Sequence, residues 1–257
     1  MSAIDFGRHS GDYAEHRPGF PPSFYRRLDS LAPIEGTRAL DLATGPGTVA
    51  LELAALGSSV VGIDISEGQI AAAQRASAAR ELESKARFLV ARAESTGLDS
   101  GSFDLVTAGQ CWHWFDSAAV LAEVHRLLRP LGALAIAHFS YLAEHSPVAR
   151  DTEELILKFN PSWSMAGSTG IHPEIIDAVI RGGFRLVEQF CYDHDEGFTH
   201  AGWRGRMRTC NGVGSGGLSP VEVTRFDNAL QMLLKERYPD PVTVEHRIWC
   251  VVARKPA

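Results

Sequence analysis

The stretch ALDLATGPGTVA, residues 39–50, contains the pattern that decides the fold. A short apolar strand runs through Asp41, a turn with Gly45 and Gly47 follows, and the turn leads directly into a helix. In an open α/β sheet, a nucleotide-like ligand binds in the crevice beyond the carboxyl end of such a strand. A Cβ atom at either glycine would block the tight turn or hold the backbone away from the ligand. The stretch therefore predicts a nucleotide-like ligand at a strand–turn–helix junction.

A second predicted strand ends in the acidic residue Asp64. The segment VVGIDIS, residues 60–66, is apolar and β-branched, and a helix is expected directly after it. An ionised carboxylate has two acceptor oxygens, so Asp64 can accept hydrogen bonds from both hydroxyls of a ribose. The alternative, which stays open, is that Asp64 caps the helix beginning near Glu67 and that Asp41 caps a turn.

A third predicted strand leads into a loop at Ala93 and Glu94. It lies in the segment FLVARAE, residues 88–94. A polar side chain and backbone amides in this loop can bind the edge of an adenine ring. Three successive strand ends with these residues form a constellation that is harder to obtain by chance than any one motif.

Strands and helices alternate up to about Ala137, which predicts βαβ units and a parallel sheet. After His138 the alternation breaks, and a glycine-rich loop at 211–217 separates two later helices. The expected strands are 38–43, 59–64, 87–91, 103–108, 132–138, 184–192 or beyond, and 242–252. The expected helices are 47–56, 67–82, 117–128, 152–159, 172–182, 199–207 and 220–237.

This order of motifs resembles the class I S-adenosylmethionine-dependent methyltransferases over roughly the first half of the chain. FDLVTA, residues 103–108, looks like the fourth strand of that family, and LLRPLGAL, residues 127–134, looks like its helix–Arg-Pro-Gly–strand step. The resemblance implies a Rossmann-like, doubly wound α/β fold with a mostly parallel seven-stranded sheet, an antiparallel last strand and helical cap insertions. It implies one domain over residues 1–257, organised as an N-terminal lid or helix at 1–30, a cofactor-binding core at 36–138 and substrate-cap insertions at 139–170 and 197–240.

The same resemblance implies S-adenosyl-L-methionine as the cofactor. Asp41 and the two glycines match the signature that holds the methionine part, Asp64 matches the ribose-binding acid, and Glu94 lies on the adenine side. The chain departs from the family at Ala43, where glycine is usual. The residues expected to bind the cofactor are Asp41, Ala43, Gly45, Gly47, Asp64, Ile65, Gln69, Ala93, Glu94, Gln110, Tyr13 and Arg17.

The loop QCWHWFD, residues 110–116, follows the fourth strand, where the transferring methyl group is expected to emerge. Aromatic rings and a histidine in one loop suit an aromatic-walled pocket, so Trp112 and Trp114 are predicted to bind substrate. His113 is the predicted catalytic residue, as a hydrogen-bond donor or general base. The alternatives are that a tryptophan closes the core and that His113 is structural.

Two further segments resemble a subgroup of small-molecule methyltransferases, similar to the UbiE type and the trans-aconitate methyltransferases. In that subgroup the segment around Tyr13 and Arg17 folds over the cofactor; the alternative is a surface arm on the sheet edge. The helix around Arg206 looks like the subgroup's Arg-Thr-Ser-Gly-Val region, although Cys210 and Asn211 break its pattern. An inward Arg206 can bind a substrate carboxylate, whereas a solvated helix face is the commoner outcome.

Composition limits the possible partners. The net charge of −6, without a block of lysine and arginine, argues against nucleic acid and anionic membranes. No apolar run reaches membrane-spanning length, the N-terminal residues lack a signal-peptide core, and the four scattered cysteines have no metal-binding spacing. We therefore expect a cytoplasmic protein, a monomer or homodimer, with a small-molecule substrate and no metal.

The functional prediction is transfer of a methyl group to an oxygen, nitrogen or carboxylate acceptor on a small molecule by in-line displacement. One alternative is an NAD(P)-dependent oxidoreductase, because Gly45-x-Gly47-x-x-Ala50 also fits the dinucleotide-binding pattern. That alternative does not call for Asp41 before the loop or for Glu94. The other alternative is a non-catalytic partner protein that binds S-adenosylmethionine.

Overall fold

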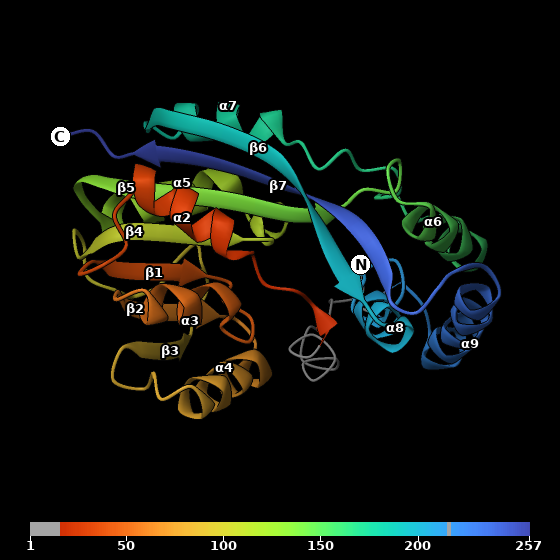
Figure 1. Cartoon of the computed structure of the whole chain (residues 1–257). Coiled ribbons are helices and arrows are strands. Elements are labelled where there is room, and N and C mark those ends of the chain that lie inside the picture. The colour runs from red at the N-terminus through yellow and green to blue at the C-terminus, as the bar shows by residue number, and fades with distance from the viewer. Residues whose placement is uncertain (1–15, 215–216) are drawn as a thin grey trace. The chain divides into compact units, whose positions relative to one another are not determined.

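The computed structural model describes residues 16–214 and 217–257, which contain a seven-stranded sheet with the order β3-β2-β1-β4-β5-β7-β6 (Figure 1). β1 pairs in parallel with β2 and β4, β2 with β3, and β4 with β5. β7 runs against its neighbours in Figure 1, so the predicted mostly parallel sheet with an antiparallel last strand is confirmed. The strands are β1 (Arg38–Leu42), β2 (Ser59–Asp64), β3 (Ala86–Val90), β4 (Phe103–Gly109), β5 (Leu128–Tyr141), β6 (Arg185–Phe198) and β7 (Val242–Arg254).

The helices begin where the sequence supplies caps or prolines. Ser66 caps α4 by accepting the Gln69 amide at 3.4 Å, and Asp116 caps α5 by accepting the amides of Ala118 and Ala119. Pro147 opens α6 five residues before the predicted start, because its ring favours the first helical turn. The helices are α2 (Pro22–Leu31), α3 (Thr48–Ala55), α4 (Glu67–Ala79), η1 (Trp112–Trp114, a 3-10 turn), α5 (Ser117–Leu127), α6 (Pro147–Phe159), α7 (Pro173–Arg181), α8 (His200–Arg208) and α9 (Pro220–Arg237).

Two strands are long. β5 begins at Leu128 rather than at the predicted 132, and β6 continues beyond Tyr192 to Phe198, an extension that the prediction left open. The polar run after Tyr192 does not look like a strand, but it alternates between exposed and partly buried positions. Arg247 on β7 donates two hydrogen bonds to Asp193, at 2.7 Å each, so cross-strand pairing overrides the weak local preference.

The chain forms two compact units. We call them the Rossmann unit (Gly19–His138, Ile248–Ala257 and His172–Cys191) and the helical unit, whose described residues are 16–18, 139–171, 192–214 and 217–247. Both predicted insertions, 139–170 and 197–240, fall within the helical unit. Their assignment as substrate caps of a single domain stays a prediction.

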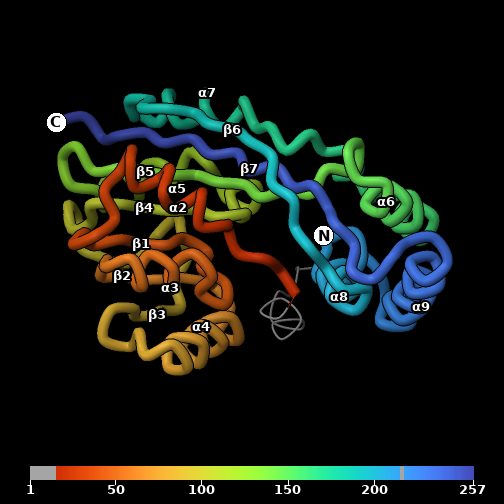
Figure 2. Tube along the Cα trace, viewed as in Figure 1, coloured from red at the N-terminus to blue at the C-terminus, as the bar shows by residue number. Residues whose placement is uncertain are grey.

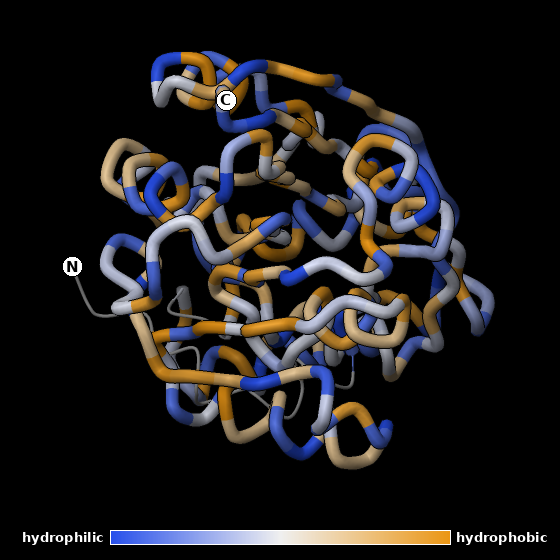
Figure 3. Tube along the Cα trace, turned by 90° about the vertical axis from the view of Figure 1, so that its left-hand side faces the viewer, coloured by the Kyte–Doolittle hydropathy of each residue, from blue (hydrophilic) through white to orange (hydrophobic). Residues whose placement is uncertain are grey.

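Each unit has its own apolar core. In the Rossmann unit, the buried side chains of the central strands pack with α5 and α7, and a Cβ atom at Gly182 would lie 3.0 Å from Leu121. In the helical unit, Trp203 is fully buried and donates from Nε1 to Thr152 Oγ1 at 3.0 Å. Figure 2 shows the Cα trace coloured by position along the chain. Figure 3 shows it coloured by hydropathy, with hydrophobic stretches alternating with hydrophilic ones. Among the described residues, no helix is both long enough and apolar enough to span a bilayer.

Candidate functional site

Asp41 lies one residue before the carboxyl end of β1 and is 2% exposed. Thr44 Oγ1 donates to one carboxylate oxygen at 2.6 Å, and Thr107 Oγ1, on the neighbouring strand β4, donates to the other at 2.7 Å. Burial raises the pKa of Asp41 to about 6, although both hydroxyl groups lower it. A cation bound beside Asp41 would stabilise its ionised form, so this carboxylate suits a positively charged ligand group.

Asp64 holds the glycine-bearing turn against the end of β2. Its Oδ2 accepts the Gly45 amide at 3.0 Å, and its Oδ1 accepts the Ser66 amide at 2.9 Å. Each carboxylate oxygen has a second lone pair, so two further hydrogen bonds can be accepted from a ribose. The side chain that caps α4 is Ser66 and not Asp64. The alternative that Asp64 serves only as the cap of this helix therefore does not hold. Burial raises the pKa of this carboxyl group too.

The turn after β1 has a left-handed backbone at three positions. The φ angles are 46° at Ala43, 56° at Gly45 and 87° at Gly47. Glycine adopts these angles without strain, but Ala43 does not, so the residue that departs from the family pattern is strained. Gln110, just after β4, has a φ of 62°, and its backbone N–H donates to the backbone carbonyl of Ala137 at 2.9 Å. Strained residues cluster at ligand sites, and these two follow the ends of adjacent strands.

The side chains around the ends of β2 and β3 differ in exposure. Ile65 is 62% exposed directly after Asp64, so it offers an apolar surface for a flat ring. Gln69 and Ala93 are buried, and Glu94 is partly buried with an ion pair to Arg92 at 3.3 Å. These residues lie where the sequence predicts ribose and adenine contacts, which stay predictions.

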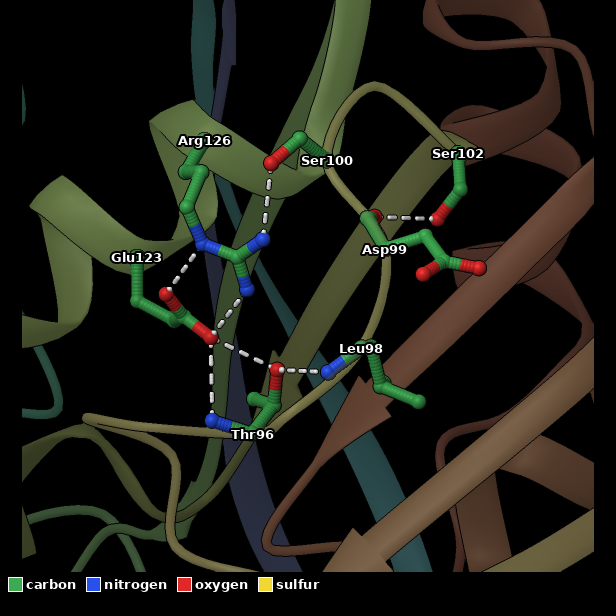
Figure 4. Close-up of polar contacts among 7 residues, drawn as sticks. All are labelled: Thr96, Leu98, Asp99, Ser100, Ser102, Glu123 and Arg126. Carbon is green, nitrogen blue, oxygen red and sulfur yellow. Dashed lines mark hydrogen bonds and ion pairs between the residues drawn. The ribbon is translucent and has the colours of Figure 1, made fainter.

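A polar network anchors the loop that follows β3 to α5 (Figure 4). Glu123 Oε1 accepts from both the amide and the hydroxyl of Thr96, at 2.9 and 2.6 Å, and both carboxylate oxygens bind Arg126. Arg126 also donates to Ser100 Oγ at 2.8 Å. Hydrogen bonding to Arg126 lowers the pKa of Glu123 to about 2. The network thereby fixes the loop that carries Glu94.

The loop after β4 separates its aromatic residues. Trp112 is 3% exposed and packs edge-on against Phe115 in the core, with ring centroids 5.8 Å apart. Trp114 is 41% exposed and lies next to His113, whose ring centroid is 4.5 Å away. Cys111 donates to the Leu42 carbonyl, and burial raises the pKa of its thiol well above the usual range. The tryptophan at 112 therefore packs as a core side chain, while residues 113 and 114 face outward.

Comparison with known proteins places a family model, described as a methyltransferase domain, over residues 40–136. This range spans β1 to β5 and contains both carboxylates and the loop after β4. Residues 40–136 thus match a methyltransferase domain. The match agrees with the resemblance that the sequence motifs carry.

The methyltransferase domain also has relatives among curated proteins and solved structures. An uncharacterized methyltransferase of Mycobacterium tuberculosis is 34% identical over 134 residues, which are 52% of this chain and 51% of the relative. The chain thus spans about half the length of the curated relatives it matches. A putative type II methyltransferase from Anaeromyxobacter dehalogenans has a TM-score of 0.65 at 26% identity, covering 93% of this chain and 98% of that one. A Haemonchus contortus phosphoethanolamine N-methyltransferase, solved with S-adenosylhomocysteine, shares the fold at 19% identity and a TM-score of 0.59, covering 100% of this chain and 61% of that one.

Three predicted residues lie outside the methyltransferase domain. Tyr13 falls outside the described residues. Arg17 donates to the hydroxyl and the carbonyl of Thr209 at 3.2 and 3.4 Å, within the helical unit. Arg206 is 6% exposed, and its guanidinium lies 4.8 Å from the ring centroid of Tyr141, so it is a buried residue rather than part of a solvated helix face. Their predicted roles toward cofactor and substrate stay predictions.

Sequence reasoning missed several polar residues of the Rossmann unit. Thr44 and Thr107 complete the hydrogen bonds of Asp41, and a threonine in a strand gives no signal of that role. His138 and His172 stack with ring centroids 4.0 Å apart, although the chain separates them by more than thirty residues. Proximity of this kind follows from topology and cannot be read from spacing.

One group of potential metal ligands lies in the helical unit. Ligand atoms of His145, Asp193 and Glu245 lie within 4.8 Å of one another. His145 Nδ1 already contacts Glu245 at 2.8 Å, and Arg247 occupies both oxygens of Asp193. These contacts account for the group without a metal ion.

Proposed function

We propose that this protein is an S-adenosylmethionine-dependent methyltransferase that methylates an oxygen, nitrogen or carboxylate acceptor on a small molecule. The observation that carries the proposal is the pair of buried carboxylates, Asp41 and Asp64, at the ends of adjacent strands beside a glycine-bearing turn. The Haemonchus contortus neighbour, solved with S-adenosylhomocysteine, supports the choice of cofactor.

The residues present fit this cofactor. Asp41 combines a buried carboxylate with a raised pKa, which suits the ammonium group of the methionine part. Asp64 has unused lone pairs for the ribose hydroxyls, and the exposed side chain of Ile65 offers an apolar face for the adenine ring. The bound cofactor supplies a methyl group already activated on a sulfonium ion.

The protein's part in such a reaction is chiefly to position the acceptor and to exclude water. Holding a nucleophile in line with the carbon–sulfur bond can supply on the order of 7–11 kcal/mol of the barrier reduction. A carboxylate acceptor needs no base, whereas a phenol or amine loses a proton. His113, after β4, is the residue for which the sequence predicts that role, and Trp114 beside it is the predicted substrate contact.

Two other functions are distinguished by simple binding experiments. An NAD(P)-dependent oxidoreductase would bind a dinucleotide, and a non-catalytic partner protein would bind S-adenosylmethionine without turnover. The match to a methyltransferase domain favours methyl transfer over both, and the acid before the glycine turn argues further against a dinucleotide. We further propose a small-molecule substrate, a cytoplasmic location, and a monomer or homodimer without nucleic-acid or membrane partners, on the basis of the net charge of −6 and the composition.

The test is calorimetric titration with S-adenosylhomocysteine, with NADH and NADPH as parallel ligands. Micromolar binding of S-adenosylhomocysteine alone is expected, and Asp41→Ala and Asp64→Ala should each weaken it about tenfold or more. Asp99→Asn, at an exposed loop position, is the matched control and should bind normally. Binding of a dinucleotide alone, or intact affinity in both alanine variants, would overturn the proposal.

A further inference from the structure

A line of five rings runs through the Rossmann unit next to the end of β4. Trp114 lies 4.5 Å from His113, His113 lies 6.1 Å from His138, and His138 lies 4.0 Å from His172. The ring of Trp249 closes the line, 5.4 Å from His172 and 6.2 Å from His138. One end of the line is exposed at Trp114, and the other end is fully buried at Trp249.

His138 occupies a position beside the proposed methyl-transfer site. β5 pairs with β4 so that Ala137 lies opposite Gly109, which places His138 beside Gln110 one residue beyond the carboxyl end of β4. His172 comes from the turn that precedes α7 and stacks on His138 at an interplanar angle of 30°. Two segments that are distant in sequence thus bring two imidazoles together at the end of the sheet where the cofactor is proposed to bind.

The two imidazoles carry buried nitrogens without hydrogen-bond partners in the described part of the chain. His138 is 4% exposed, and its Nε2 has no partner there. Nε2 of His172 has none either, while its Nδ1 lies 3.4 Å from Glu174 Oε1. A buried polar atom left unsatisfied destabilises the folded protein, so two such atoms on stacked rings point to a ligand that binds them.

The charge state of the pair selects the kind of ligand. Burial, with the neighbouring imidazoles of His172 and His113, lowers the pKa of His138 well below its usual range. Burial also lowers the pKa of His172, against the opposing effect of Glu174. Both rings are therefore neutral near pH 7. A neutral imidazole that accepts at Nε2 requires a hydrogen-bond donor, so a carboxylate would face it with lone pairs only.

The surrounding rings select a flat donor. Stacked and edge-on rings pack well against another aromatic ring. A phenol brings such a ring, and its pKa of about 10 leaves its proton within reach of an imidazole base. The two histidine rings face each other instead of converging on one point, which does not suit a metal ion.

We propose that the acceptor is a phenolic hydroxyl group and that His138 Nε2, with His172 as its positioning residue, takes up the phenol's proton. This proposal rests on the proposed methyl transfer and assigns to His138 the role that the sequence suggested for His113. In the step, the O–H bond breaks and its proton moves to Nε2. The oxygen electron pair forms the new bond to the methyl carbon, and the electron pair of the breaking carbon–sulfur bond stays on sulfur.

The first test uses 4-nitrophenol as the probe, at about pH 6, where most of it keeps its proton, and the whole protein saturated with S-adenosylhomocysteine. With ¹⁵N-labelled histidine, the His138 side-chain signal is identified by its loss in His138→Phe, a variant that keeps a ring but removes both nitrogens. We expect 4-nitrophenol to shift this signal and 4-nitroanisole, which has no hydroxyl group, to leave it unchanged. An unmoved signal with 4-nitrophenol and with a panel of other phenols means that only water binds these nitrogens, and it overturns the proposal.

The second test measures turnover of the phenol that binds best. His138→Phe should lower kcat about a hundredfold or more with a much smaller change in KM, and His172→Phe should lower it less. The control is His125→Phe, whose ring packs on Phe184 at 5.5 Å, and it should keep normal turnover. In the pH profile of kcat, the acidic limb assigned to His138 should vanish in His138→Phe, with His113, His172 and Glu174 as the other titratable groups near the pair.

The outcomes separate this inference from the proposed function. If the wild-type protein does not bind S-adenosylhomocysteine, both the proposed function and this inference are refuted. Normal cofactor binding with phenol methylation unchanged in His138→Phe would refute the inference alone. A retained pH limb in that variant would refute it as well.

Discussion

Replacing Asp41 by asparagine should make the unliganded protein more stable at neutral pH. The carboxyl group is buried between two threonine hydroxyls, and burial raises its pKa from 3.8 to about 6. A difference of this size means that the ionised group opposes folding by about 3 kcal/mol near pH 8. Asparagine keeps the shape and can bond to both hydroxyls without a charge, so it removes this cost.

The pH dependence gives the prediction its sign and an internal control. Because the folded pKa lies above the unfolded one, the wild-type protein gains stability from Asp41 as the pH falls through about 6. The advantage of Asp41→Asn should therefore drop from about 3 kcal/mol near pH 8 to about half of that near pH 5. Urea denaturation at both pH values measures it, with Asp99→Asn as an exposed control that should change stability by less than about 0.5 kcal/mol.

The same variant should lose cofactor affinity. A charged hydrogen bond to an ammonium group contributes about 1.5–3 kcal/mol, which corresponds to about a tenfold to hundredfold loss of S-adenosylhomocysteine binding. Gain of stability with loss of binding would show that the buried charge serves the ligand and opposes the fold. A variant that is no more stable than wild type near pH 8, with no pH dependence in the difference, would refute the reasoning.

Three further predictions concern the same domain. Cofactor binding to the wild-type protein should weaken about tenfold per pH unit below about pH 6, as Asp41 becomes protonated, and pH-independent titration calorimetry down to about pH 5 would contradict this. Ala43→Gly should raise the free energy of unfolding by about 0.5–1 kcal/mol, because it relieves a left-handed alanine, and a lower melting temperature would contradict it. Glu123→Gln should lower the free energy of unfolding by about 1–2 kcal/mol and weaken cofactor binding. Glu83→Gln, at an exposed position, should do neither. The stability that Glu123 contributes to the wild-type protein should disappear as the pH falls from about 4.5 toward about 2.

The central strands and the acidic strand ends could be predicted because their signals are local. An apolar run that ends in an acid before a glycine turn specifies strand, turn and helix within a dozen residues, and Asp41 and Asp64 lie where that pattern placed them. The helix starts were less accurate where proline shifted them, as at Pro147.

The partners of these residues could not be predicted, because they depend on strand order. Thr107 reaches Asp41 only because β4, not β2, is the neighbour on that side of β1. The stack of His138 on His172 depends on where a distant turn returns to the sheet. The exact end of β6 stayed open in the sequence, because the ion pair between Arg247 and Asp193 outweighs the weak local preference of its polar run.

The network around Glu123 has a consequence for protein engineering. It fastens the loop after β3 at Thr96 and Ser100, downstream of the residues proposed to contact the adenine ring. One end of this loop is fixed by the sheet and the other by α5. Side chains between these two points can therefore be substituted while the backbone keeps its conformation. Residues 91–95 are therefore the segment in which to randomise side chains when seeking variants that accept cofactors with a modified base, while Glu123 and Arg126 are kept.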